Sequence, residues 1–202
     1  MAITIEEIKK LKELTGVGLT DAKKALTEAN GDFDAALKAM REKGMTKAEK
    51  RGEREAREGL IEAYVHSGRI GVLVELNCET DFVARTEDFK NLAHDLALQV
   101  AAMSPKWISA EDIPAEEVER KKAELLEAAK TDEKNAKKPA DVLEKIIDGQ
   151  MKKYFDELTL TEQAYWKDDS IKVGDLIKTA AAKLGENVVV RQFKRIELGV
   201  SE

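Results

Sequence analysis

The feature that most constrains the fold is a change in hydrophobic period near residue 59. Before it, apolar residues recur every three or four positions, the spacing of one face of an α-helix. After it, two β-rich runs at 59–66 and 69–78 flank Ser67-Gly68, a pair typical of a two-residue hairpin turn. Helical spacing then returns, and a last β-rich run follows at 188–196. The chain is therefore predicted to be an α+β protein with a small antiparallel sheet covered by helices.

The first 44 residues are predicted to form a domain of three short helices. Thr4 and Glu7 have the spacing of a capping box, and Asp21 and Asp32 are expected to open the second and third helices. Glycines separate the helices, and Gly44 is expected to end the last one. The apolar positions predicted to face inward are Ile5, Ile8, Leu11, Leu14, Ala22, Ala25, Leu26, Ala29, Phe33, Ala36, Leu37 and Met40.

A charged segment, residues 45–58, separates this domain from the rest of the chain. Basic and acidic side chains alternate along it, which is typical of a solvated helix or linker and not of a nucleic-acid patch. We therefore predict a domain boundary here, with an α+β core over residues 59–202. Helices in the core are predicted to begin near Thr86, Pro114 and Pro139, and a last helix is predicted from about Val173 to Leu184, ended by Gly185. Residues 158–166 are predicted to be extended.

The last β-rich run carries apolar residues at both parities. Val188, Val190 and Ile196 would share one face of a regular strand, and Val189 and Phe193 the other. Both faces of this strand are therefore expected to be covered.

Composition excludes several classes of protein. The chain has 202 residues, and 34 Lys and Arg against 40 Asp and Glu give a net charge of −6, so direct nucleic-acid binding is not expected. Charged residues make up 37% and hydrophobic ones 43%, a balance typical of a folded, soluble protein. The N-terminus has no apolar stretch of signal-peptide type, and no window approaches ~18 apolar residues. We expect a cytoplasmic protein with no membrane partner.

The sequence contains few residues that could form a metal site or a nucleotide-binding site. Cys78 is the only cysteine, which excludes an intrachain disulfide and a cysteine-based zinc finger, and His66 and His94 are the only histidines. The glycine pair at residues 16–18 lacks the lysine and the preceding strand of a phosphate-binding loop. No metal and no cofactor is therefore expected.

A cysteine-dependent enzyme is one alternative that the residues leave open. Cys78 would be its nucleophile and His66 or His94 its base, with Glu79 and Asp81 close behind in the chain. The simpler interpretation is that Cys78 completes the buried face of a strand, since apolar residues precede it at the same parity.

The segment from Glu79 to Thr86 joins a strand to a helix, yet it carries Phe82 and Val83 where a turn would favour polar residues. In one interpretation, one of these side chains packs under the following helix as a hydrophobic staple. In the other, Phe82 is an exposed aromatic plug, presented beside a carboxylate to the cleft of a partner protein. Composition does not decide between the two.

Two stretches of the chain resemble the signature motifs of the bacterial elongation factor Ts family. They are Leu11-Lys-Glu-Leu-Thr-Gly-Val-Gly-Leu-Thr-Asp-Ala-Lys-Lys-Ala-Leu26 and Asn77-Cys-Glu-Thr-Asp-Phe-Val-Ala84. Their order and the charged segment between them also match, so the resemblance covers nearly the whole chain. It implies a non-enzymatic guanine-nucleotide exchange factor that promotes GDP release from elongation factor Tu during translation elongation.

The resemblance also implies an architecture. The family fold has an N-terminal three-helix domain like the ubiquitin-associated domain, followed by an α+β core with an antiparallel sheet. Longer members have two related core halves, whereas this chain has one hairpin and resembles the short form. Pairing of two chains would restore the second half, so the resemblance implies a homodimer.

The resemblance assigns partner-binding roles to Thr80, Asp81, Phe82, Val83, Lys12, Leu19, Thr20 and His66. Asp81 and Phe82 match the wedge that enters the nucleotide-binding domain of elongation factor Tu and disturbs its magnesium and phosphate site. Lys12, Leu19 and Thr20 match positions that contact the same partner domain, although many members have a methionine pair where this chain has Leu19-Thr20. His66 matches a histidine that lies near the partner in the longer form.

A second alternative is a binding adaptor, since three-helix domains of this type also bind ubiquitin-like partners or other helices. Its function would lie in residues 1–44, with the core as a dimerisation platform. The exchange-factor interpretation differs because it needs both parts of the chain.

Overall fold

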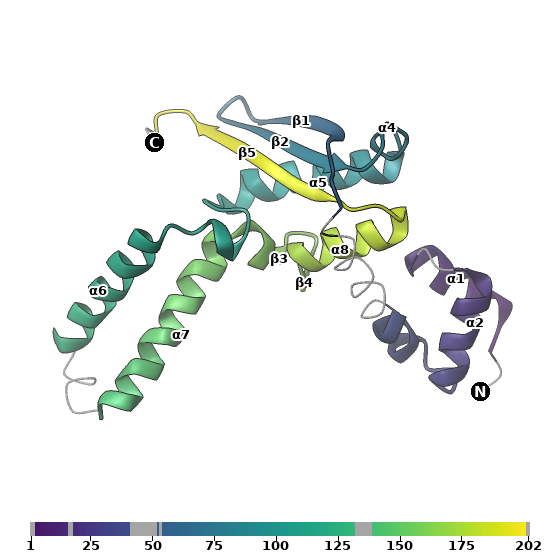
Figure 1. Cartoon of the computed structure of the whole chain (residues 1–202), viewed down its shortest axis with the longest axis horizontal. Helices are drawn as coiled ribbons and strands as arrows, with labels where there is room; N and C mark the ends of the chain where they lie inside the picture. The colour runs from purple at the N-terminus through teal and green to yellow at the C-terminus, as the bar shows by residue number, and fades with distance from the viewer. Residues whose placement is uncertain (1–2, 16–17, 41–51, 53, 132–138, 201–202) are drawn as a thin grey trace. The chain divides into compact units, whose positions relative to one another are not determined.

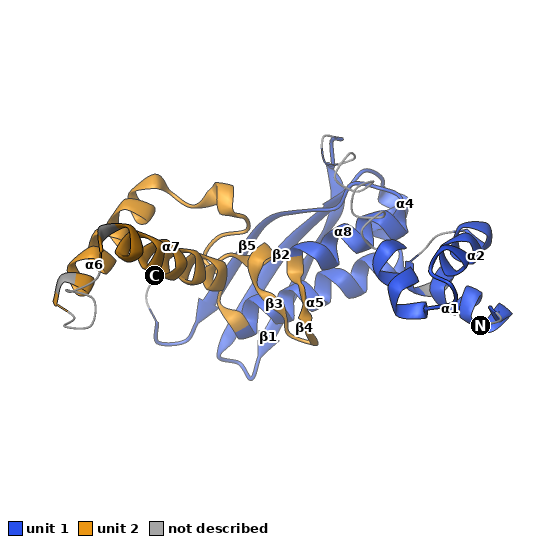
Figure 2. Ribbon diagram, turned by 90° about the horizontal axis from the view of Figure 1, so that it is seen from below, with its two compact units in different colours: residues 1–102, 174–202 blue, residues 103–173 orange. Residues whose placement is uncertain are grey.

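The computed structural model describes residues 3–15, 18–40, 52, 54–131 and 139–200, and Figure 1 labels the helices and strands. The chain divides into two compact units, residues 1–102 with 174–202 and residues 103–173 (Figure 2). Most of the charged segment and Gly44 lie outside the described residues, so the predictions made for them stay predictions.

Three helices near the N-terminus share a small hydrophobic core. They are α1 (Ile5–Thr15), α2 (Leu19–Glu28) and the helical residues 33–40. The predicted capping box is present: the Thr4 N–H donates to Glu7 Oε2 at 2.9 Å, and the Glu7 N–H donates to Thr4 Oγ1 at 3.2 Å. The core consists of Leu11, Ala22, Ala25, Leu26, Ala36 and Met40, with Ile3, Ile8, Ala29, Phe33 and Leu37 packed against it.

Two predictions for these helices are wrong. Helix α2 begins at Leu19, with Gly18 in an extended conformation as its N-cap, and not at Asp21. Ile5 and Leu14 are 71% and 43% exposed, so they do not belong to the inward face of α1. The neighbouring α2 presents mainly alanines, and this small contact covers only the middle of the apolar stripe on α1.

The predicted sheet is present, in the order β1-β2-β5 with both pairs antiparallel. Strands β1 (Glu58–His66) and β2 (Ile70–Cys78) form a hairpin whose turn residues, Ser67 and Gly68, have φ of 50° and 66°, as a type I′ turn requires. Strand β5 (Val189–Glu197) pairs with the other edge of β2. Gly59 has φ 148°, and a Cβ there would collide with the carbonyl of Leu76, so the hairpin needs glycine at this point.

Helix α5 (Glu87–Met103) covers one face of the sheet, and Figure 1 shows it beneath the strands. Thr86 caps this helix as predicted, accepting a hydrogen bond from the Phe89 N–H at 3.3 Å. Helix α8 (Val173–Leu184) has the predicted bounds, and its Lys183 pairs with Asp88 of α5 at 2.9 Å. Buried side chains from these elements include Val72, Val74, Leu76, Cys78, Phe89, Leu92, Leu96, Val100 and Val190.

A β-bulge in β5 changes which of its residues face the helices. Two adjacent residues of β2 pair with Val190 and Gln192, so Arg191 is an extra residue in the strand. Beyond the bulge the parity switches, and Phe193 lies on the same face as Val190 while Ile196 lies on the opposite face. The predicted grouping of Ile196 with Val190 is therefore wrong, because it assumed a regular strand.

Among the described residues of the single chain, no element covers the other face of the sheet, so the expectation that both faces are covered is not met within one chain. Its exposed apolar side chains, here called the open sheet face, are Ile61, Val65, Leu73, Val189 and Ile196. In the strand register Val65 and Ile196 lie on either side of Gly71. The glycine leaves a flat place between two apolar side chains.

The second unit is built on a helical hairpin. Its arms are α6 (Ala115–Thr131) and α7 (Ala140–Leu158), which follow the prolines that predicted them. The turn η1 (Ala110–Asp112) precedes α6. Residues 158–166, predicted to be extended, instead contain the end of α7, the turn η2 (Leu160–Glu162) and only two strand residues, β3 (Ala164–Tyr165), which pair with β4 (Asp168–Lys172). Three short elements in succession explain the mixed sequence pattern there.

Candidate functional site

The segment between β2 and α5 contains a helical turn, α4 (Asp81–Ala84), where a loop was predicted. Thr80 is its N-cap: the backbone of Thr80 is extended, and its hydroxyl oxygen accepts a hydrogen bond from the Val83 N–H at 3.4 Å. We call residues 80–85 the α4 turn. Because Thr80 caps the turn, the helical backbone conformation of the residues after it is fixed. That conformation sets the direction in which each side chain leaves the turn.

The side chain of Phe82 points away from the core. It is 78% exposed, the highest value among the large apolar side chains that the structure describes. Ala84 is 8% exposed and Val83 is half-buried, so these two residues make the inward contacts of the turn. The staple interpretation therefore does not apply to Phe82.

Asp81 is held by a single ion pair within the turn. Its Oδ2 lies 2.8 Å from Nη2 of Arg85, and the two side chains are 45% and 77% exposed. An exposed pair of this kind contributes only ~0–1 kcal/mol, so the carboxylate can leave it at little cost. Asp81 therefore presents an available carboxylate from the residue that precedes Phe82.

The other residues predicted to bind a partner lie elsewhere in the first unit. His66 ends β1 beside the hairpin turn, and its Nδ1 is 2.9 Å from the Tyr64 hydroxyl. Because the hairpin pairs along nine residues, His66 and the α4 turn lie at its opposite ends. Lys12, Leu19 and Thr20 are all exposed and flank the connection between α1 and α2. The structure thus does not bring His66 to the α4 turn.

Cys78 is a buried residue at the end of a strand. Burial, reinforced by the negative charge of Glu186, raises the pKa of its thiol to about 11, so the thiol stays protonated near neutral pH. His66 lies eight residues away along the hairpin, roughly 27 Å at ~3.4 Å per residue. His94 is paired with Glu62, 2.8 Å from its Nδ1. These facts give Cys78 a packing role and do not support a cysteine-dependent enzyme.

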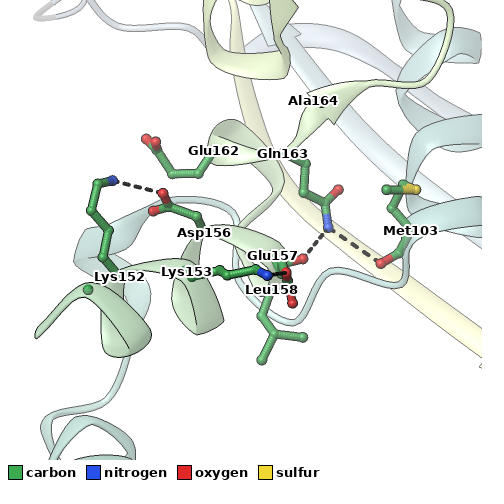
Figure 3. A pocket seen from close by; sticks show the side chains of 10 residues that line it. Met103, Lys152, Lys153, Asp156, Glu157, Leu158, Glu162, Gln163 and Ala164 are labelled. Carbon is green, nitrogen blue, oxygen red and sulfur yellow. Dashed lines mark hydrogen bonds and ion pairs between the residues drawn. The ribbon is translucent and has the colours of Figure 1, made fainter. Parts of the chain in front are cut away.

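A pocket of about 690 Å³ lies in the second unit, beside the end of α7 (Figure 3). Four of its charged groups pair with one another, Lys152 with Asp156 at 2.7 Å and Lys153 with Glu157 at 4.0 Å, and Glu162 pairs with Lys172. The Gln163 side chain donates to the carbonyl oxygen of Glu157 at 2.8 Å. These groups hold the end of the helix and do not converge on a common point, so the pocket is not the candidate site.

Sequence reasoning missed the residues that hold the α4 turn in place. Glu186 accepts hydrogen bonds from the backbone N–H groups of Glu79 and Thr80, each at 3.0 Å. It lies 107 and 106 residues further along the chain, just after α8. A glutamate after a helix end carries no local signal for such a role, because the pairing exists only in the tertiary structure.

Within the described ranges, no three His, Cys, Asp or Glu side chains are grouped so that they could hold a metal ion. No helix in that part of the chain combines the length and apolar character needed to cross a membrane. The α4 turn is thus the candidate site, and an exposed aromatic residue on a fixed strand–helix joint is typical of a protein-binding module.

Comparison with known proteins gives this module a family. The family model described as Elongation factor TS matches residues 3–200. Proteins named Elongation factor Ts are 50% identical in Herpetosiphon aurantiacus (98% of this chain, 99% of that protein), 52% in Thermotoga petrophila (98% and 98%) and 47% in Fervidobacterium nodosum (98% and 100%). The chain belongs to the elongation factor Ts family, whose role is in translation elongation.

Proposed function

We propose that the chain is a guanine-nucleotide exchange factor, and not an enzyme, that promotes GDP release from elongation factor Tu in the cytoplasm. The observation that carries this proposal is the exposed ring of Phe82 on a capped turn, in a chain of the elongation factor Ts family. In this proposal Asp81 and Phe82 enter the nucleotide-binding domain of the partner, and Thr80 and Val83 hold the turn that carries them. No cofactor, metal or nucleic acid takes part.

The chemistry of the two side chains suits this role. Burying an exposed phenyl ring in a partner's cleft removes apolar surface from water, which is favourable. Phe82 has only two side-chain torsions, so binding orders few degrees of freedom. The carboxylate of Asp81 is a hard oxygen ligand of the kind that magnesium prefers, and it repels phosphate. Together the two side chains favour an open nucleotide site that has lost its magnesium and phosphate contacts.

Exchange requires differential binding and no covalent step. The factor must bind the nucleotide-free partner more tightly than the GDP-bound partner, and reciprocity then weakens GDP by the same factor. A coupling of ~4 kcal/mol would weaken GDP roughly a thousandfold, at ~1.4 kcal/mol per decade. Phe82 contributes to this coupling only through contacts that exist once the partner's site has opened. GTP then binds by mass action and displaces the factor.

The N-terminal helices supply the second proposed contact. Lys12, Leu19 and Thr20 are exposed near the facing ends of α1 and α2, and Leu19 is 51% exposed. A lysine can attract an acidic partner surface as the two proteins approach, and an exposed leucine can be buried against that surface in the complex. His66, at the other end of the hairpin from the α4 turn, is proposed as a third and separate contact.

We also propose that two chains form a homodimer through the core sheet. The open sheet face exposes Ile196 by 72%, Ile61 by 69% and Val65 by 67%. In an antiparallel sheet with one face in water, the residues on the solvated face are normally polar. The apolar residues on the open sheet face are therefore more typical of a face that another protein surface covers. A two-fold axis would place the same patch of each chain against the other.

The experiment that tests the proposed function is release of fluorescent GDP from elongation factor Tu, with and without this protein. We expect substoichiometric amounts to accelerate release, because the factor is displaced by GTP and acts again. Equal rates in both reactions would overturn the proposal.

A further inference from the structure

The backbone at the end of β2 leaves the sheet before it reaches the α4 turn. Strand β2 pairs with its neighbours only as far as Cys78, so Glu79 and Thr80 have no strand partner in the described part of the chain. Their N–H groups donate instead to one atom, Oε2 of Glu186, at 3.0 Å each. Hydrogen bonds to a carboxylate are about twice as strong as those between neutral groups. Glu186 therefore replaces the sheet as the support of this backbone.

The second oxygen of Glu186 acts on the cap of α4. Its Oε1 accepts the hydroxyl proton of Thr80 at 2.6 Å. A hydroxyl has one proton and two lone pairs, so with its proton directed at Glu186 the oxygen of Thr80 is left to accept the Val83 N–H. One carboxylate thus fixes both the backbone and the side chain of the capping residue.

The contact between the two segments is reciprocal. Oε1 of Glu79 accepts the N–H of Asn187 at 2.7 Å, so each segment holds the backbone of the other. We call Glu79, Glu186 and Asn187 the loop clamp. Asn187 is 5% exposed, and its side-chain amide donates to the carbonyl oxygen of Arg54 at 2.7 Å. The end of the charged segment is therefore tied to the same clamp as the α4 turn.

We propose that Glu186 is a positioning residue for nucleotide exchange, which holds the α4 turn in the conformation that presents Phe82 to the partner. This inference rests on the proposed exchange function. A ring on a free loop loses conformational freedom when it enters a cleft, whereas a ring on a clamped turn has lost that freedom during folding. The loop clamp thereby favours the complex with the open partner, although its own hydrogen bonds are all internal to the chain.

The test measures fluorescent-GDP release from elongation factor Tu with the full-length chain and its variants. Glu186→Ala removes all three hydrogen bonds, and we expect release to slow about tenfold, with a moderate fall in the melting temperature of a chain that still unfolds cooperatively. Glu186→Gln keeps one oxygen for the backbone N–H groups but loses the acceptor for the Thr80 proton, so its rate should be intermediate. Glu87→Ala is the matched control, since it removes the same charge nearby from an exposed pair with Lys90 at 3.2 Å. We expect it to match the wild type.

A double-mutant cycle with Phe82→Ala separates positioning from direct contact with the partner. If Glu186 acts through the α4 turn, adding Glu186→Ala to Phe82→Ala slows release by less than Glu186→Ala does in the wild type. Additive losses would overturn the inference, because Glu186 would then act on the partner by itself. A wild-type rate for Glu186→Ala would overturn it as well.

Amide hydrogen exchange tests the clamp without the partner. The N–H groups of Val83 and Ala84 bond to Thr80, and their exchange should accelerate in Glu186→Ala but not in Glu87→Ala. If the wild-type chain does not accelerate GDP release from elongation factor Tu, the proposed function is wrong. Amide exchange still shows in that case whether Glu186 holds the α4 turn. Unchanged protection in Glu186→Ala would overturn the positioning role.

Discussion

The thiol of Cys78 donates a hydrogen bond to the carbonyl oxygen of Thr80, 3.1 Å away, and so joins the last buried residue of β2 to the N-cap of α4. The exposure of Phe82 follows from this joint. Residues two apart on a helix point ~200° from each other, so a turn that buries Ala84 must direct Phe82 outward. The core and the proposed contact are thus linked within seven residues of chain.

Phe82→Ala should slow GDP release and leave the melting temperature nearly unchanged. The ring has 78% of its surface in solvent, so the core loses little when it is removed. Truncating a hot-spot aromatic costs an interface ~2–4 kcal/mol, which is a loss of roughly 30-fold to 1,000-fold. Release kinetics and calorimetry on the same samples make the comparison.

Phe89→Ala is the matched control for that variant, because the same side chain is removed from a position that is 0% exposed. It should lose ~3–5 kcal/mol of unfolding free energy. If Phe82→Ala lowers the melting temperature as much as Phe89→Ala does, the ring of Phe82 is a packing residue. The same conclusion follows if Phe82→Ala accelerates GDP release from elongation factor Tu as much as the wild type does.

Cys78→Ala should retain nucleotide exchange, since the thiol is assigned to packing. Removing one buried sulfur should lower the unfolding free energy by about 1 kcal/mol, within the usual range for single substitutions. Denaturant titration and release kinetics give the two values. Lost activity in a variant that unfolds normally would restore the cysteine-dependent enzyme as an explanation.

The raised pKa of Cys78 predicts a loss of stability at alkaline pH. In the unfolded chain the thiol titrates near ~8.5, whereas burial raises its pKa to about 11 in the folded chain. Between these values the unfolded state binds fewer protons than the folded state, so the unfolding free energy falls as the pH rises, by up to ~3 kcal/mol. Below that window the thiol contributes no pH dependence.

Urea unfolding at pH 8 and at roughly pH 10.5, in the wild type and in Cys78→Ala, isolates this effect. Lysines and tyrosines titrate in both proteins, so only the difference between the two slopes reports on the thiol. Parallel slopes would mean that the thiol of the folded chain ionises as readily as that of the unfolded chain.

Deletion of residues 1–44 should leave a folded core that binds elongation factor Tu much more weakly. The helices there have a hydrophobic core of their own, in which Leu11 and Leu26 are fully buried. Thermal unfolding and a binding titration of the shortened chain test this. Aggregation, or loss of a cooperative transition, would show that the proposed boundary cuts through one domain, and full function without the helices would contradict their role as a contact.

Local sequence signals predicted most elements because those elements are locally determined. Helix α8 has the predicted bounds, since Gly185 at φ 81° ends it. The hairpin turns at Ser67 and Gly68, both at positive φ, as predicted, although the register His66–Ile70 adds Arg69 to the connection. The motif around Phe82 was likewise visible, since an aromatic residue stands out in a strand–helix joint.

What the sequence could not predict depends on contacts distant in the chain. The bulge at Arg191 follows from how β5 pairs with β2, and it reverses the side on which Phe193 and Ile196 lie. The role of Glu186 depends on a partner 106 residues away. Ile5 fits the apolar stripe of α1 but is 71% exposed. The hydrophobic period shows which residues share the apolar face of a helix or strand, but it does not show whether another element covers that face.

The proposed homodimer makes the last prediction, and Gly71 is the position that tests it. Gly71 lies between Val65 and Ile196 on the open sheet face, and a Cβ added there meets nothing within 4 Å in the single chain. Gly71→Glu should therefore leave the monomer folded, while it places a charge in the middle of an apolar interface, where an unpaired carboxylate is costly.

Sedimentation equilibrium over a dilution series should show a dimer for the wild type, with a monomer fraction that grows on dilution, and a monomer for the variant. Gly149→Glu is the matched control, since that glycine also has free space around it but lies on α7, in the second unit, and is not part of the sheet. If Gly71→Glu sediments like Gly149→Glu, the open sheet face is not the interface, and if the wild type exchanges nucleotide at full rate as a monomer, the second chain is not needed for function.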